Sequence, residues 1–104
     1  DGAGFVEKVG AKVSEFSVGD RVLIQPLTYC GTCRWCTENK ENYCEKWGIF
    51  GENQDGTQCE YMAINADHLR IIPEGMSFEE AAAFPLVAET AWAMLIDRAN
   101  IRRG

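Results

Sequence analysis

The sequence predicts one small, mainly β domain with a cysteine-rich loop in its first half and short helices near its C-terminal end. Short runs of β-branched and aromatic residues are bounded by Gly, Asp and Pro, a pattern typical of strands. One segment holds four cysteines and has neither helical nor strand periodicity, which indicates a loop. A helix start signal followed by alanines predicts a helix in the last third of the chain.

Four segments have the composition of short strands. Their β-branched and aromatic residues favour a pleated backbone, and the Gly, Asp or Pro residues near their ends favour turns. The segments are FVEKVG at 5–10, DRVLIQP at 20–26, QCEYMAIN at 58–65 and HLRII at 68–72.

The predicted strand at 58–65 has an alternating pattern. It places Cys59, Tyr61 and Ala63 on one face of the strand. Because a small apolar side chain suits such a face, we expect Cys59 to be a buried free thiol rather than a metal ligand or a nucleophile.

The helix prediction rests on a capping box. Ser77 and Glu80 form the pattern S-x-x-E directly before three alanines, so a helix should start there. Pro85 lacks a backbone N–H and is expected to interrupt this helix. The apolar spacing in 87–99 then predicts that a second helix resumes after it.

Length and charge limit the possible functions. A domain of 104 residues has a modest core, so a covalent or metal staple would matter for its stability. The net charge is −6, from 16 acidic and 10 basic residues, and no long basic run exists, so we expect no nucleic-acid partner. The sequence has neither a long apolar stretch nor a signal-peptide pattern, so we expect no membrane partner and a cytoplasmic location. The chain begins without Met, and we expect it to be a piece of a larger protein.

The four clustered cysteines are the strongest signal in the sequence. Their spacing is C-x2-C-x2-C-x7-C, within a segment that we call the cysteine lobe, residues 29–47. Disulfides between cysteines three residues apart would close very small, strained rings. A ferredoxin-type iron–sulfur site shares the spacing of the first three cysteines, but its fourth cysteine follows after three residues and precedes Pro. The four candidate ligands are Cys30, Cys33, Cys36 and Cys44.

Zinc is the chemistry that this spacing favours, with an iron site and disulfides as the alternatives. A C-x2-C turn presents two thiolates to one ion, and a tetrahedral structural zinc takes four such ligands. A site with four protein ligands leaves no position for a substrate, so we expect it to be structural. Its formal charge is −2, which Arg34, Lys40 and Lys46 in the lobe could offset, although a solvated basic face explains these residues equally well. Trp35 and Trp47 flank the ligands and are expected to shield the sulfurs from water.

Six stretches of the chain, taken together, carry a family resemblance. They are GAGFVEKVG, FSVGDRV, the four-cysteine loop, DGTQCEYMAI, IPEGMSFEEAAAFPL and TAWAML. In this order they resemble the zinc-containing alcohol dehydrogenases of the medium-chain dehydrogenase/reductase superfamily. The resemblance implies that residues 1–104 are a partial GroES-like catalytic domain, an incomplete open β-barrel whose cysteine lobe holds one structural zinc. It also implies that an NAD(P)-binding Rossmann domain belongs to the parent protein and is absent from this chain.

The departures from the family concern catalysis. Zinc members of this kind hold a second, catalytic zinc with an upstream Cys, a His-Glu pair and a later Cys. The Glu corresponds to Asp1, the His would precede the chain, and the later Cys falls at Leu86. Asn53 stands where similar members often have a His. The resemblance therefore implies no catalytic and no cofactor-binding residue in this chain.

His68 is the one histidine of the chain. It could act as a ligand or a general base, but neither a second histidine nor a carboxylate cluster accompanies it. We therefore expect it to pack at the surface or at a strand end, and we assign it no catalytic role.

Two functions remain open from the sequence. The first is a fragment of an NAD(P)-dependent oxidoreductase whose parent acts on a small alcohol or carbonyl substrate, with no turnover by the fragment alone. The second is a stand-alone, zinc-stabilised binding module without catalysis. If the family's preceding strands are missing, exposed sheet edges and apolar faces should also lead the chain to associate with a copy of itself.

Overall fold

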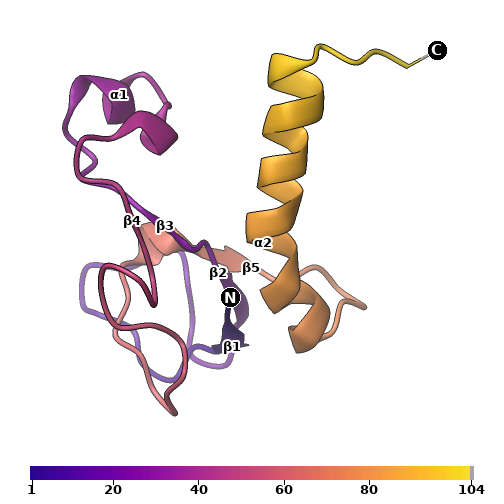
Figure 1. Ribbon diagram of the computed structural model, residues 1–104. Coiled ribbons are helices and arrows are strands. Elements are labelled where there is room, and N and C mark those ends of the chain that lie inside the picture. The colour runs from indigo at the N-terminus through magenta and orange to yellow at the C-terminus, as the bar shows by residue number, and fades with distance from the viewer. Residues whose placement is uncertain (104) are drawn as a thin grey trace.

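The computed structural model describes residues 1–103 and contains two small antiparallel sheets, a cysteine lobe and a long C-terminal helix (Figure 1). The first sheet has the order β1-β2-β5 and the second pairs β3 with β4. Within residues 1–103 these strands form no closed barrel. The strands are β1 (Ala3–Phe5), β2 (Arg21–Ile24), β3 (Leu27–Thr28), β4 (Gly48–Ile49) and β5 (Leu69–Ile71).

The core lies where the first sheet meets the start of the C-terminal helix. Leu23 on the central strand β2 packs with Ile72 and Ala81, and all three side chains are buried. Ala3, Met76 and Phe78 cover this cluster from its edges. The predicted strands at 20–26 and 68–72 are therefore confirmed, because their apolar residues supply the sheet that this core needs.

The N-terminal strand is shifted from its prediction. The chain pairs as β1 at Ala3–Phe5, whereas the prediction placed the strand at 5–10. Val6 still exchanges backbone hydrogen bonds with the β2 side, to Asp20 O at 2.9 Å and from Gly19 N at 2.8 Å, and the pairing then stops.

The C-terminal helix α2 (Phe78–Trp92) begins at the predicted capping box. The Ser77 hydroxyl accepts from Glu80 N at 3.2 Å, and Ser77 N donates to the Glu80 carboxylate at 2.9 Å. The predicted break at Pro85 is wrong, because the helix runs through it and continues as the π-helical turn η3 (Ala93–Arg98). Proline costs the helix one hydrogen bond and crowds the carbonyl one turn earlier, and burial of the Pro85 ring offsets part of this cost.

The predicted strand at 58–65 is also wrong. This segment has no partner strand within the described residues and follows an irregular path. Tyr61 is 74% exposed, and Cys59 is exposed rather than buried, with its thiol near the Gly56 carbonyl. Alternation alone does not make a strand when no neighbouring edge pairs with it.

The arrangement leaves two parts projecting from the sheets. Figure 1 shows the cysteine lobe at the far end of the β3–β4 ribbon, and α2 rising from the sheet. The first turns of α2 pack against β1 and β2, and further along the helix the Glu89 carboxylate accepts from the Gln25 side-chain amide at 2.6 and 2.7 Å. None of the helices in residues 1–103 has the length and apolar character needed to cross a membrane.

Candidate metal centre

The β3–β4 ribbon carries the chain into the cysteine lobe and out again. Leu27 lies opposite Ile49 and Thr28 opposite Gly48, so the two ends of the lobe are held side by side. A side chain at Gly48 would lie 3.0 Å from Thr28 Oγ1 and 3.1 Å from Asn53 Oδ1. Glycine therefore lets the two ends of the lobe approach closely.

Two short helical turns set the directions of the four cysteines. Gly31 takes a positive φ of 72°, which lets the chain turn sharply after Cys30. The single helical turn α1 (Arg34–Thr37) then carries Cys36, and the turn η1 (Glu41–Tyr43) leads directly to Cys44. The loop predicted for this segment thus contains two helical turns, of four and three residues, which are too short to give a helical period in the sequence.

The four thiol sulfurs converge on one point. The sulfurs of Cys30, Cys33, Cys36 and Cys44 all lie within 4.8 Å of one another. The Cys33–Cys36 sulfurs are 3.6 Å apart and the Cys30–Cys36 sulfurs are 3.9 Å apart. A tetrahedral zinc with sulfur ligands about 2.3 Å away separates those sulfurs by about 3.8 Å, so the donor set fits such an ion.

Backbone amides point at the sulfurs. Cys33 N donates to Cys30 Sγ at 3.3 Å, and both Cys30 N and Lys46 N donate to Cys44 Sγ at 3.3 Å. The Thr32 hydroxyl adds a weaker contact to Cys30 Sγ at 3.7 Å. Such donors stabilise thiolates, which are the form that binds a metal.

The thiols differ in how readily they ionise. The N–H groups of Thr32 and Cys33, followed by the Thr32 hydroxyl, lower the pKa of Cys30 to about 6. The backbone N–H of Cys36 lowers the pKa of Cys33. Burial, followed by the neighbouring Cys33 side chain, raises the pKa of Cys36 to about 12. Burial and the neighbouring sulfurs thus oppose ionisation of Cys36, and a cation bound at the cluster would favour it.

The basic residues of the lobe face other partners. Arg34 stacks 4.3 Å over the Trp35 ring, and Lys40 forms an ion pair with Glu38 at 2.9 Å. Trp35 also packs against Tyr43 at 5.4 Å between ring centroids. Arg34 and Lys40 are exposed, and these contacts are with Trp35 and Glu38 rather than with the sulfurs. This favours the alternative of a solvated basic face for these two residues.

The structure limits the shielding expected of Trp47 and adds a contact between η3 and the lobe. Trp47 is 51% exposed, so its expected role in shielding the sulfurs is at most partial. The Arg98 guanidinium donates to the Tyr43 hydroxyl, which joins the end of η3 to the lobe. No sequence signal pointed to this contact, because the two residues are 55 positions apart.

His68 lies outside the sulfur cluster. It ends the 3₁₀ turn η2 (Ala66–His68) directly before β5 and is 8% exposed, so the expected packing at a strand end is what the structure shows. Its ring meets those of Tyr29 and Phe50 edge to face, at 5.1 and 5.4 Å between centroids. Burial lowers the pKa of His68, so the imidazole is neutral at pH 7.

The positions that correspond to catalytic ligands lie elsewhere. Leu86 is 43% exposed on α2, and the side chain of Asn53 accepts from Ile49 N at 2.9 Å within a turn. Among residues 1–103, the four cysteines are the one group of three or more His, Cys, Asp or Glu residues whose ligand atoms converge. Their assignment as metal ligands stays a prediction.

Comparison with known proteins places this geometry in context. Residues 1–74 match the model of the alcohol dehydrogenase GroES-like domain. The chain is 39% identical over 97 residues to an alcohol dehydrogenase of Geobacillus stearothermophilus, covering 91% of this chain and 28% of that protein.

Two solved structures have the same fold. The crystal structure of an NAD-dependent alcohol dehydrogenase matches all of this chain and 30% of its own, at 42% identity and a TM-score of 0.96. A cobalt- and zinc-bound thermostable alcohol dehydrogenase from Pyrobaculum aerophilum matches 98% of this chain and 31% of its own, at 36% identity and a TM-score of 0.85. The chain thus spans less than a third of the length of these relatives.

Proposed function

The chain belongs to the family of alcohol dehydrogenase GroES-like domains, and on that premise we propose that it is part of the catalytic domain of a zinc-containing, NAD(P)-dependent oxidoreductase. Residues 1–104 would form the incomplete barrel of that domain, and residues 29–47 its structural zinc lobe. The cofactor would be bound by a separate domain of the parent protein. The parent's substrate would be a small alcohol or carbonyl compound.

The convergence of four sulfurs within 4.8 Å is the observation that carries this proposal. Cys30, Cys33, Cys36 and Cys44 would hold one zinc, and the backbone amides directed at Cys30 and Cys44 would stabilise their thiolates. A zinc with four thiolate ligands supplies folding energy and offers no open position to a substrate. We also propose a cytoplasmic location, because clustered cysteines that serve as metal ligands rather than as disulfides are typical of that compartment.

We assign no catalytic step to this chain. Hydride transfer requires a cofactor domain that orients the nicotinamide against the substrate. Leu86 and Asn53 carry no group that replaces the missing ligands of a catalytic zinc. The role of the chain in the parent would be to support the substrate-binding half of the enzyme.

Self-association is part of the proposal. Helix α2 and η3 leave large apolar side chains exposed, and unpaired apolar faces of this kind associate with other copies. The exposed residues are Phe84, Leu86, Val87, Trp92, Met94, Leu95 and Ile96.

Elemental analysis tests the metal assignment. The purified chain should contain about one zinc, and replacement of zinc by Co²⁺ should give the intense charge-transfer bands of a thiolate-bound, tetrahedral ion. Cys59→Ser is the matched control, because Cys59 is exposed and lies outside the cluster, and it should retain the full metal content. A metal-free chain with oxidised cysteines, or loss of metal in Cys59→Ser, would show that the assignment is wrong.

A further inference from the structure

A groove with unpaired backbone lies at the free edge of strand β1. It has a volume of about 790 Å³ and is lined by residues 1–10, by residues of the segment 57–64, and by the apolar side chains of Val22, Ile24 and Leu69. These three side chains belong to β2 and β5. The groove thus combines an apolar lining with two stretches of backbone, and its volume is large enough for a bound ligand.

Strand β1 leaves one row of its backbone groups unpaired. The Gly2 carbonyl and the Val6 N–H both form hydrogen bonds with the β2 side, at 2.9 Å each. Because the direction of hydrogen bonding alternates along an antiparallel strand, the backbone groups of Ala3 and Phe5 point to the opposite side. Within residues 1–103 no strand pairs with that side, so β1 offers a free edge to the groove.

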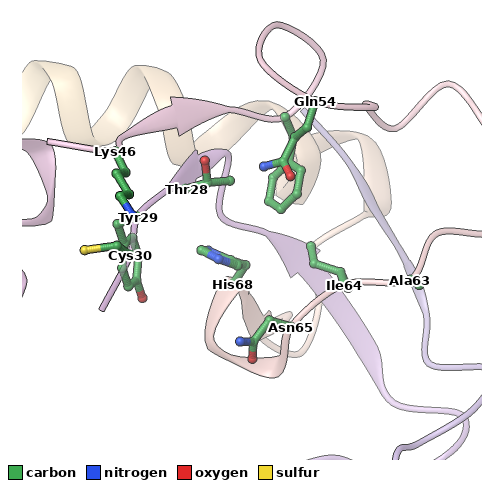
Figure 2. Close-up of a pocket in the computed structure, with 10 residues that line it drawn as sticks. Thr28, Tyr29, Cys30, Lys46, Gln54, Ala63, Ile64, Asn65 and His68 are labelled. Atoms are coloured by element: carbon green, nitrogen blue, oxygen red, sulfur yellow. The ribbon is translucent and has the colours of Figure 1, made fainter. Parts of the chain in front are cut away.

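The segment 57–64 is the second source of unpaired backbone. Among the described residues, none of its N–H and C=O groups bonds to another backbone group. Its side chains nevertheless alternate, since Tyr61 and Ala63 are exposed whereas Met62 and Ile64 are half-buried. This period of two is that of a strand. Figure 2 shows the chain at Ala63 and Ile64 as a coil that leads into η2. The segment therefore has the side-chain pattern of a strand and lacks a neighbour to pair with.

The two unpaired rows approach each other at one point. The Thr57 hydroxyl donates to the Asp1 carbonyl at 2.6 Å, and a Cβ at Gly2 would lie 2.6 Å from the Thr57 methyl carbon. In the part of the chain that the structure describes, no backbone hydrogen bond joins residues 1–10 to residues 57–64. The groove therefore has backbone partners for one further extended chain, and free edges of this kind accept an added strand.

The charges of the groove select the side chains of such a strand. The charged residues that line it are Asp1, Glu7, Lys8 and Glu60. Three of these are acidic and one is basic, and all four are exposed, so the rim of the groove has a negative charge. A strand that alternates between apolar and basic residues would direct one set of side chains at the apolar lining and the other at this rim.

We propose that this groove binds a separate, extended peptide of alternating apolar and basic residues as an additional β-strand. The peptide backbone pairs with the free side of β1 and with the segment 57–64. Its apolar side chains cover Val22, Ile24 and Leu69, and its basic side chains face the acidic rim. The site goes beyond the proposed function and does not depend on it, because it uses neither the sulfur cluster nor a cofactor domain.

Three short peptides with blocked ends test the pattern and the charge. VKVKVK has both features, VVVKKK has the same composition without alternation, and VEVEVE alternates with the opposite charge. In an NMR titration of the zinc-loaded chain, VKVKVK should give saturable shifts of the amides of Ala3, Phe5 and residues 61–64. The other two peptides should bind more weakly by about tenfold or more, because one loses the fit of its side chains and the other is repelled.

N-methylation separates strand pairing from attraction between side chains. VKVKVK with methyl groups on alternate backbone amides keeps its side chains and charge but loses the donors toward one neighbour. It should bind more weakly by about tenfold or more. Saturating VKVKVK, unlike the methylated peptide, should also slow hydrogen exchange at amides within residues 61–64.

Charge variants of the chain assign the site. Glu7→Lys combined with Glu60→Lys reverses the charge of the rim, so it should weaken VKVKVK by about tenfold or more and strengthen VEVEVE. Glu52→Lys combined with Glu74→Lys is the matched control, because both glutamates are exposed and lie outside the groove, and it should leave both affinities unchanged.

Four outcomes would overturn the proposal. They are the absence of saturable shifts, equal binding of VKVKVK and VVVKKK, full binding of the N-methylated peptide, and an unchanged peptide preference in the Glu7→Lys, Glu60→Lys chain. Protection of the amides of residues 61–64 in a dimer without peptide would also count against it, because a second copy of the chain would then fill the groove.

Discussion

The cysteine lobe and the sheet core are ordered by different forces. The core buries Leu23, Ile72 and Ala81 between a sheet and a capped helix, so apolar area removed from water stabilises it. In the lobe, the buried side chains are those of Cys36 and Cys44, and the large side chains of Tyr43 and Trp47 remain exposed. The lobe thus depends on its sulfurs, and each region can be weakened while the other is left intact.

The largest effect should come from breaking the sulfur cluster. Cys33→Ser removes one of four ligands, and because metal binding supplies the folding energy of such a site, the lobe should lose several kcal/mol of stability. Hydrogen exchange should show fast exchange for residues 29–47, while the amides of β2 stay protected. Fast exchange in both regions would mean that the core depends on the lobe.

The second effect concerns the core. Leu23→Ala leaves a cavity beside Ile72 and Ala81 and should lower the free energy of unfolding by about 2–4 kcal/mol, measured by urea denaturation. The metal content should remain at about one zinc, because the sulfur ligands do not touch this cluster. Loss of zinc from a folded Leu23→Ala chain would contradict the separation of the two regions.

The same contrast explains how much of the structure was predictable. The cysteine spacing and the Ser77–Glu80 capping box are local patterns, and both signals act within a few residues of chain. Strands β3 and β4 were missed because two residues each are too short for an alternating pattern. The helix through Pro85 and the exposed Cys59 depend on which neighbours are present, and sequence periodicity does not contain that information.

The candidate site was predictable only in part for a similar reason. The four converging cysteines lie within 15 residues, so their spacing was informative. The ring cluster around His68 combines residues 29, 50 and 68, which lie far apart in the sequence. A single histidine has no sequence pattern that would have revealed its burial between Tyr29 and Phe50.

The smallest effect should come from the protonation of His68, which lies where the two regions meet. Burial lowers its pKa; Arg70 adds to this, whereas Asp67 and the Leu27 carbonyl oppose it. In the unfolded chain the pKa of histidine is about 6.5. Just below this pH the unfolded state binds a proton at His68, whereas the folded state binds it only at lower pH. The contribution to stability is therefore complete above about pH 6.5 and is lost as the pH falls toward the lowered pKa of the folded state.

His68→Gln isolates this contribution from the acid release of metal, because both proteins keep the four cysteines. As the pH falls from neutral to mildly acidic, the free energy of unfolding measured in urea should fall more steeply for the unmodified chain than for His68→Gln. The two proteins should become more alike in slope once the pH exceeds about 6.5, where the imidazole is neutral in both states. Identical slopes across the acidic range would mean that His68 is free to take up its proton in the folded chain. In that case the burial of His68 between Tyr29 and Phe50 would not make the stability of the folded chain depend on pH.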